Sequence, residues 1–224
     1  EGIDYIMSLF RIITEKTLIP ECQDQEPRFK ELQEKLLILE KNIGYLLPPA
    51  DLLPNFALKS LGAKIVHSMT SDTYQSQDTF SCFGFLIRPP AISPDIVIQG
   101  VSHPLPGKCW PFGGSKGRIS ISLPNNVLIS HVSLNHIPKR ISIHGTISSA
   151  PKEFSIYGKK DLESDESLLG TFLYDEDGDQ LQIFKLPDYV TGSFRYITLQ
   201  VKSNWGNPDY TCLYGFRVHG KLEK

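Results

Sequence analysis

The chain has 224 residues, of which 40% are hydrophobic and 21% are charged, and its formal net charge at pH 7 is -2. A chain of this size and composition can form one globular domain of about 100 to 200 residues together with an extension. The near balance of charges gives no reason to expect nucleic acid or an anionic membrane surface as the main partner.

The sequence contains no predicted signal or membrane-spanning segment. No run of about 18 apolar residues is present, and no basic stretch followed by an apolar stretch opens the chain. Because the first residue is Glu1 rather than methionine, we expect a fragment that reaches a membrane only through a segment upstream of it.

Residues 1–54 predict an α-helical stalk. Over residues 28–47, apolar side chains recur at alternating spacings of three and four, which is the a/d pattern of a coiled coil. The positions are Phe29, Leu32, Leu36, Leu39, Ile43 and Leu46. Residues 3–18 carry a shorter pattern of the same kind. Because so short a helix is marginal alone, we expect either an oligomeric coiled coil, such as a homotrimer, or a helical bundle packed on its own domain.

From Phe56 onward the pattern changes to short alternating runs separated by turn residues, which predicts strands. The runs cover residues 117–123, 127–134, 154–157, 168–174, 181–186, 196–201 and 214–218. No long helical pattern lies between them. The predicted fold class is therefore mainly β, an antiparallel β-sandwich over residues 55–224.

One segment, residues 74–94, does not follow this rhythm. It is polar through Asp78 and then aromatic-rich, with Phe83, Phe85 and Ile87 alternating against Cys82 and Leu86. This pattern favours a hairpin or flap with an open edge, which can recruit a further strand.

The acidic stretch Asp175-Glu-Asp-Gly-Asp179 invites a calcium site, but its glycine and its twelfth position do not match an EF-hand loop. Its place between two strand-like runs favours a hairpin turn instead.

The four cysteines match no zinc-binding spacing. Cys109 and Cys212 lie beside aromatic residues and turns, and could form a long-range disulfide in an oxidising compartment or remain two buried thiols. No nucleophile and base are paired in the sequence, so a hydrolase is disfavoured. The segment 203–220, with two tyrosines around Cys212, reads instead as a binding surface.

Four motifs, in this order along the chain, are similar to those of SUN domains. They are Cys109-Trp-Pro-Phe112, His136-Ile-Pro-Lys139, Ile147-Ser-Ser-Ala-Pro-Lys-Glu-Phe-Ser-Ile-Tyr-Gly158, and Leu168-Leu-Gly170 with Tyr174-Asp-Glu-Asp-Gly178. The resemblance runs from about Asn55 to Gly220. It implies a non-enzymatic tether of the inner nuclear membrane. Its homotrimeric domain would lie in the perinuclear space and bind the C-terminal luminal tail of a KASH protein, forming the LINC bridge between nucleus and cytoskeleton.

The resemblance also implies roles for individual residues. His136, Ser149, Tyr210 and Tyr214 would form the pocket for the last residues and terminal carboxylate of the KASH tail. Residues 74–91 would be the KASH lid, which adds a strand to the peptide. The lid residues are Phe80, Cys82, Phe83, Phe85 and Ile87.

The family pattern further implies that Cys109 and Cys212 form a disulfide. The disulfide closes a loop in which the backbone carbonyls of four residues would hold a potassium-like ion, the one cofactor expected. These residues are Ile96, Gln99, Lys108 and Tyr214.

Three departures from the family pattern stand out. Thr70 occupies the position where many members have a cysteine that cross-links to the KASH peptide, so that link is not available. The loop that ends at Cys109 is about two residues longer than usual, has no acidic residue and contains Lys108, which disfavours a cation. The lid is about one residue shorter and contains Cys82. These features lean toward a germline-type paralogue active in spermatogenesis.

A second class of function stays open, since β-sandwiches of this kind also occur as carbohydrate-binding modules. Trp110 and Trp205 could stack on sugars, although buried core tryptophans are the more common case. Such a module would bind glycans and ignore a free peptide carboxylate.

Overall fold

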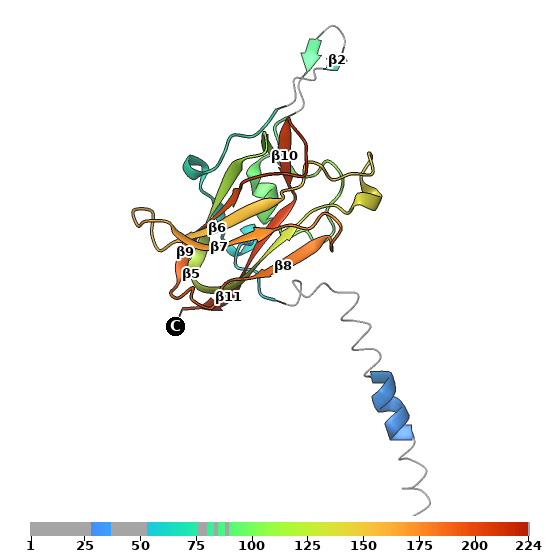
Figure 1. Ribbon diagram of the computed structural model, residues 1–224, viewed down its shortest axis with the longest axis vertical. Helices are drawn as coiled ribbons and strands as arrows, with labels where there is room; N and C mark the ends of the chain where they lie inside the picture. The colour runs from blue at the N-terminus through green and yellow to red at the C-terminus, as the bar shows by residue number, and fades with distance from the viewer. Residues whose placement is uncertain (1–27, 37–52, 76–79, 83–84, 88–89, 224) are drawn as a thin grey trace, which may run out of the picture. The chain divides into compact units, whose positions relative to one another are not determined.

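The structure, a computed structural model, describes residues 28–36, 53–75, 80–82, 85–87 and 90–223 (Figure 1). The chain divides into two compact units, Glu1–Pro48 and Pro49–Lys224. Among the described helices, none is long and apolar enough to cross a membrane. The predicted boundary between residues 54 and 55 stays a prediction, because residues 37–52 lie outside the described part.

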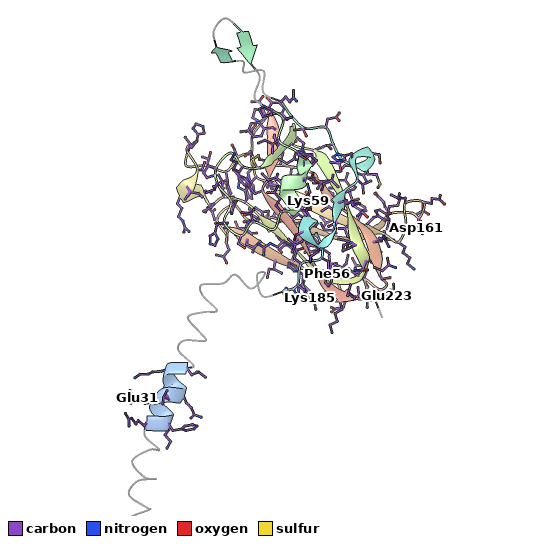
Figure 2. The ribbon with its side chains drawn as sticks, turned by 180° about the vertical axis from the view of Figure 1, so that it is seen from behind. Glu31, Phe56, Lys59, Asp161, Lys185 and Glu223 are labelled. Carbon is purple, nitrogen blue, oxygen red and sulfur yellow. A yellow bond between two sulfur atoms is a disulfide. The ribbon has the colours of Figure 1, made fainter. Side chains whose placement is uncertain are left out.

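In the N-terminal unit, residues 28–36 form an α-helix. Glu31 and Lys35 form an ion pair of 2.7 Å along it (Figure 2). The three seam positions in this helix, Phe29, Leu32 and Leu36, are 62%, 64% and 60% exposed. An exposed apolar stripe of this kind suits packing against another helix. Residues 3–18 and 37–47 lie outside the described residues.

The second unit is built from strands and short 3-10 helices. The strands are β1 Lys64–Ile65, β2 Phe80–Cys82, β3 Phe85–Ile87, β4 Trp110–Gly113, β5 Gly117–Asn135, β6 Glu153–Lys159, β7 Ser167–Leu173, β8 Leu181–Lys185, β9 Phe194–Val201, β10 Tyr210–Leu213 and β11 Gly215–Leu222. The 3-10 helices are η2 Lys59–Leu61, η3 His67–Met69, η4 Pro94–Ile98 and η5 Lys139–Ile141.

Strand β5 belongs to both layers of the sandwich. Its first part pairs with β1 and β9, and its last part pairs with β11 and β8, all antiparallel. The first layer continues from β9 to β6 and β7 (Figure 1). Phe184 of β8 packs edge-on against Phe154 of β6, with ring centroids 5.0 Å apart, and 5.4 Å from Phe172 of β7. Among the described strands, β8 pairs with β5 and not with β6 or β7, so these aromatic contacts join the two layers face to face.

A bulge shifts the phase of side chains within β5. Val127 and Ile129 are buried, and the next buried apolar residues are Val132 and Leu134. The spacing of three between Ile129 and Val132 coincides with a register shift opposite Gly220. A Cβ at Gly220 would lie 2.1 Å from the carbonyl oxygen of Leu128, so only glycine fits there.

The start of this unit is tied to its last strand. The backbone N–H of Phe56 (Figure 2) donates to the carbonyl of Val218 at 2.9 Å. The Asn55 side-chain oxygen accepts from the N–H of Val218 at 3.2 Å, and His219 Nδ1 lies 3.0 Å from the Pro54 carbonyl oxygen. These bonds fix where the preceding chain enters the sandwich.

The predicted mainly β, antiparallel fold class is confirmed. The runs predicted at 117–123 and 127–134 are parts of one strand, because the backbone stays extended through Pro124. The hairpin predicted around Asp175–Asp179 was wrong. Strand β7 before it pairs with β6, whereas β8 after it pairs with β5, so the segment crosses between layers.

Candidate functional site

A small second sheet carries Tyr210 and ends just before Tyr214. Strand β10 pairs with β4, with Thr211 opposite Phe112 and Leu213 opposite Trp110. The disulfide between Cys109 and Cys212, with 5.7 Å between their Cα atoms, locks the two segments across a sequence separation of 103 residues. The predicted disulfide is thus confirmed. By restricting the unfolded chain, a disulfide typically contributes about 2 to 4 kcal/mol to stability.

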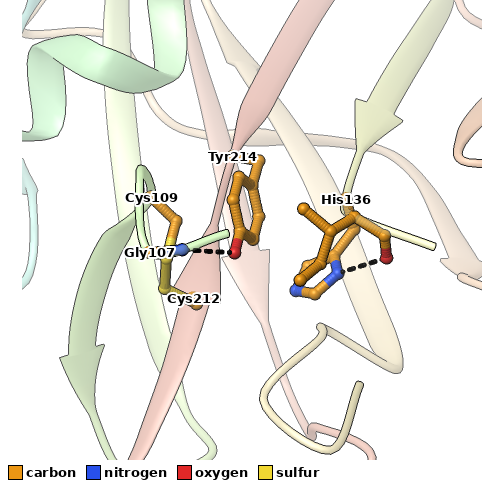
Figure 3. Close-up of a disulfide and its surroundings, with 6 residues drawn as sticks. Gly107, Cys109, His136, Cys212 and Tyr214 are labelled. Carbon is orange, nitrogen blue, oxygen red and sulfur yellow. Dashed lines mark hydrogen bonds between the residues drawn. A yellow bond between two sulfur atoms is a disulfide. The ribbon is translucent and has the colours of Figure 1, made fainter. Parts of the chain in front are cut away.

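Tyr214 and His136 lie side by side next to this disulfide (Figure 3). Their rings meet edge to face, with centroids 4.7 Å apart and planes at 77°. The Tyr214 hydroxyl accepts a hydrogen bond of 3.3 Å from the backbone N–H of Gly107. Burial raises the pKa of Tyr214, which the Gly107 hydrogen bond opposes and the nearby Tyr210 reinforces. The phenol therefore keeps its proton at neutral pH.

His136, which follows the last residue of β5, is 1% exposed. Its Nδ1 lies 3.1 Å from the carbonyl oxygen of Ile137. A carbonyl can only accept, so Nδ1 carries the proton and donates. Burial lowers the pKa of His136 to about 4, despite the opposing effect of this hydrogen bond. Near neutral pH the ring is uncharged, and Nε2, which has no partner among the described residues, is a hydrogen-bond acceptor.

Ser149 and Tyr210 belong to the same neighbourhood. The Ser149 carbonyl accepts from the backbone N–H of Cys212 at 2.8 Å, which fixes the loop before β6 against β10. Tyr210 is half-buried and stacks on Tyr74, with centroids 5.4 Å apart and planes at 24°. Tyr74 was predicted as the first residue of the lid and not as a member of the pocket, so this stacking partner of Tyr210 was missed.

The loop that the disulfide closes, residues 99–109, contains two of the predicted cation ligands, Gln99 and Lys108, whereas Ile96 precedes it and Tyr214 follows β10. The Ile96 carbonyl already accepts a hydrogen bond from the Gln99 N–H, and the Lys108 side chain is exposed. No carboxylate occurs in the loop. The described residues therefore fit a monovalent cation poorly.

The lid segment forms the hairpin that the sequence predicts. Strands β2 and β3 pair antiparallel, with Phe80 opposite Ile87 and Cys82 opposite Phe85. Phe83 lies outside the described residues. The role of the hairpin as a lid stays a prediction.

Thr70, at the position of the family's cross-linking cysteine, has a structural role. Its hydroxyl donates to the Val66 carbonyl at 2.9 Å and accepts from the Ser120 N–H at 3.1 Å. It thereby joins η3 to β5.

The tryptophans are poorly placed to stack on sugars, and the described acidic residues form no metal-binding group. Trp110 is fully buried, and Lys152 Nζ covers the ring of Trp205, 4.5 Å from its centroid. In the described part of the chain, no group of three or more His, Cys, Asp or Glu residues could hold a metal ion.

Residues 88–222 match the family model described as Sad1 / UNC-like C-terminal. SUN domain-containing protein 3 from Mus musculus is 42% identical over 172 residues, which are 75% of this chain and 52% of that protein. SUN domain-containing protein 1 from Homo sapiens is 42% identical over 175 residues, 76% of this chain and 22% of that protein. The chain therefore belongs to the SUN-domain family, as its motifs predict, and spans about half or less of the length of these relatives.

The fold also occurs in solved structures of unrelated sequence. A family 32 carbohydrate-binding module from Streptococcus pneumoniae EndoD superposes with a TM-score of 0.53 at 15% identity, covering 75% of this chain and all of that one (100%). Allantoicase from Saccharomyces cerevisiae gives 0.51 at 14% identity, covering 78% of this chain and 44% of that one. At such identities the likeness concerns the fold alone.

The pKa of His136 predicts how stability depends on pH. The folded state keeps the ring neutral down to about pH 4, whereas the unfolded chain takes up a proton near pH 6.5. The unfolded state is therefore favoured as the pH falls from 6.5 toward 4. Between pH 7 and pH 5 we expect a loss of about 2 kcal/mol from this group. Urea unfolding of the unaltered chain and of His136→Gln at both pH values measures this loss in the free energy of unfolding. The other buried histidine, His219, is present in both proteins. An equal loss in the two proteins would assign the effect to other groups.

Proposed function

We propose that this chain is a non-enzymatic tether of the nuclear envelope whose SUN domain binds the C-terminal tail of a KASH protein. Membership of the SUN-domain family supports the class of partner. The observation that carries the proposal is the cluster around Cys212, where Ser149, Tyr210, Tyr214 and His136 gather beside a disulfide. Disulfides persist in oxidising compartments, which agrees with the proposed location of the domain in the perinuclear space.

The hydrogen bonds in the pocket assign different roles to its members. Because Gly107 donates to the Tyr214 hydroxyl, that hydroxyl retains its own proton for a ligand. The hydroxyls of Ser149 and Tyr210 can donate in the same way. A terminal carboxylate accepts hydrogen bonds only, so these three side chains suit it.

His136 would have a different role from the three donors of the pocket. Its neutral ring offers an acceptor at Nε2 and is almost completely buried. In this proposal it forms the floor of the pocket and sets the orientation of Tyr214 through their edge-to-face contact. It is a positioning residue.

The helix at residues 28–36 supports the oligomeric part of the proposal. Its exposed seam of Phe29, Leu32 and Leu36 has coiled-coil spacing. We assign this seam to the interface of a homotrimer, which would present three peptide sites together.

The carbohydrate-binding alternative has weaker support. One of its two candidate tryptophans, Trp110, is fully buried and donates from Nε1 to the Thr73 hydroxyl at 2.9 Å. The other, Trp205, is covered by Lys152. The alternative then depends on the fold likeness alone.

The pocket predicts that binding requires a free carboxyl end. A proline-rich KASH C-terminal peptide is expected to bind the chain, whereas the same peptide with a C-terminal amide is not. Ser149→Ala and Tyr214→Phe should each weaken binding by about 1 to 3 kcal/mol, the cost of a charged acceptor that loses a donor. Calorimetric titration measures the affinities.

Matched controls are Ser167→Ala and Tyr189→Phe, which alter exposed residues of the same types. Equal binding of the amidated and free peptides would contradict the assigned pocket, and glycan binding without peptide binding would favour the carbohydrate-binding alternative.

The exposed seam predicts a trimer in solution. Sedimentation equilibrium of the chain should give three times the monomer mass, and Leu32→Glu should reduce it to the monomer because a charge cannot be buried in the seam. Lys30→Glu, on the same helix but off the seam, is the control. A monomer mass for the unaltered chain would contradict this assignment.

A further inference from the structure

Side chains from three other elements hold the loop at residues 99–109. The Asn135 amide, at the end of β5, donates from Nδ2 to the carbonyls of Val101 and Ser102 at 3.0 and 3.4 Å. The Gln180 amide donates to the Ser102 carbonyl at 3.0 Å. Arg217 of β11 donates to the Ser102 hydroxyl at 3.3 Å. We call Asn135, Gln180 and Arg217 the donor clamp.

The clamp satisfies the backbone oxygens near the middle of the loop. The Ser102 carbonyl receives two amide donors, which occupy both of its lone pairs. Asn135 is 1% exposed, and its oxygen Oδ1 has no partner among the described residues. A buried acceptor without a partner is costly. The Asn135 amide therefore stabilises the loop through the hydrogen bonds that its Nδ2 donates.

The clamp is continuous with the peptide pocket. Asn135 immediately precedes His136 in the chain. The Gln180 carbonyl accepts from the His136 N–H at 3.0 Å and from the Tyr174 hydroxyl at 3.0 Å. At the far end of the loop, Gly107 donates to Tyr214. The backbone of Gln180 thus binds His136 at the pocket floor, and its side chain binds the loop.

The loop offers little to a bound cation. It contains Lys108 and no carboxylate. A cation held by the carbonyls in the middle of the loop would compete with the donor clamp for the Ser102 carbonyl.

We propose that the donor clamp organises this loop in place of a metal ion, so that the domain needs no monovalent cation to hold the loop or Tyr214 in position. The part of this inference that concerns peptide affinity rests on the proposed function. The part that concerns the loop stands on the hydrogen bonds alone.

Replacing potassium tests the loop directly. Thermal unfolding of the chain is followed in potassium chloride and in choline chloride at equal ionic strength, together with hydrogen exchange of a peptide covering residues 99–109. We expect the same unfolding midpoint and the same exchange rate in both salts. A lower midpoint or faster exchange in choline would overturn the donor clamp.

A variant of the clamp supplies the positive test. Gln180→Ala keeps the carbonyl that holds His136 and removes only the amide that holds Ser102, so the protein should fold. We expect faster exchange in residues 99–109 and weaker KASH-peptide binding in both salts. Gln200→Ala, half-buried and away from the loop, is the control. Unchanged exchange in Gln180→Ala would contradict the inference.

Asn135→Ala is the second variant, and its loop should exchange faster still because the Val101 carbonyl loses the Asn135 donor and the Ser102 carbonyl loses one of its two donors. The exchange and midpoint measurements need no ligand. Absence of peptide binding in the unaltered chain would therefore refute the proposed function and leave the clamp standing, whereas potassium-dependent exchange would refute the clamp alone.

Discussion

The disulfide between Cys109 and Cys212 is the constraint on which the site depends. It joins the end of the loop at residues 99–109 to β10, and the backbone N–H of Cys212 holds the Ser149 carbonyl. Two residues later, Tyr214 contacts both Gly107 of the loop and the ring of His136. Because one covalent bond links these segments, residues distant in sequence form one rigid neighbourhood.

The sandwich supplies the frame for this bond. Strand β5 pairs with four other strands and ends at Asn135, just before His136 and directly beside β11. The buried aromatic contacts of Phe184 with β6 and β7 hold the two layers together. The proposed pocket thus lies at the end of the most extensively paired strand. The hydroxyls that we propose face the ligand come from the loop before β6, from β10 and from Tyr214. A stable frame with loop-borne donors is a common arrangement for a binding site.

The sequence predicted the strands whose alternating pattern is visible within a short stretch of residues. The alternation of Ile119, Ile121 and Leu123 identified a strand because period-two burial is visible in a short window. Strands β4 and β10 were missed because each has four residues and one contains Pro111. The pairing of β8 with β5, rather than with its chain neighbour β7, was not predictable because it joins segments that are distant in sequence. The donor clamp was not predictable either, because Asn135 and Gln180 meet the loop only after folding. The site residues themselves came from family motifs, and spacing alone would not have identified them.

The role of the disulfide is best tested by removing it. Affinity for a KASH peptide with a free carboxylate is compared between the unaltered chain and the double variant Cys109→Ala, Cys212→Ala, at a temperature where circular dichroism shows both to be folded. The arrangement described here predicts that the variant keeps its sheet signal but binds the peptide far more weakly, because Ser149 and Tyr214 are no longer held together. Equal affinity in the two folded proteins would contradict it.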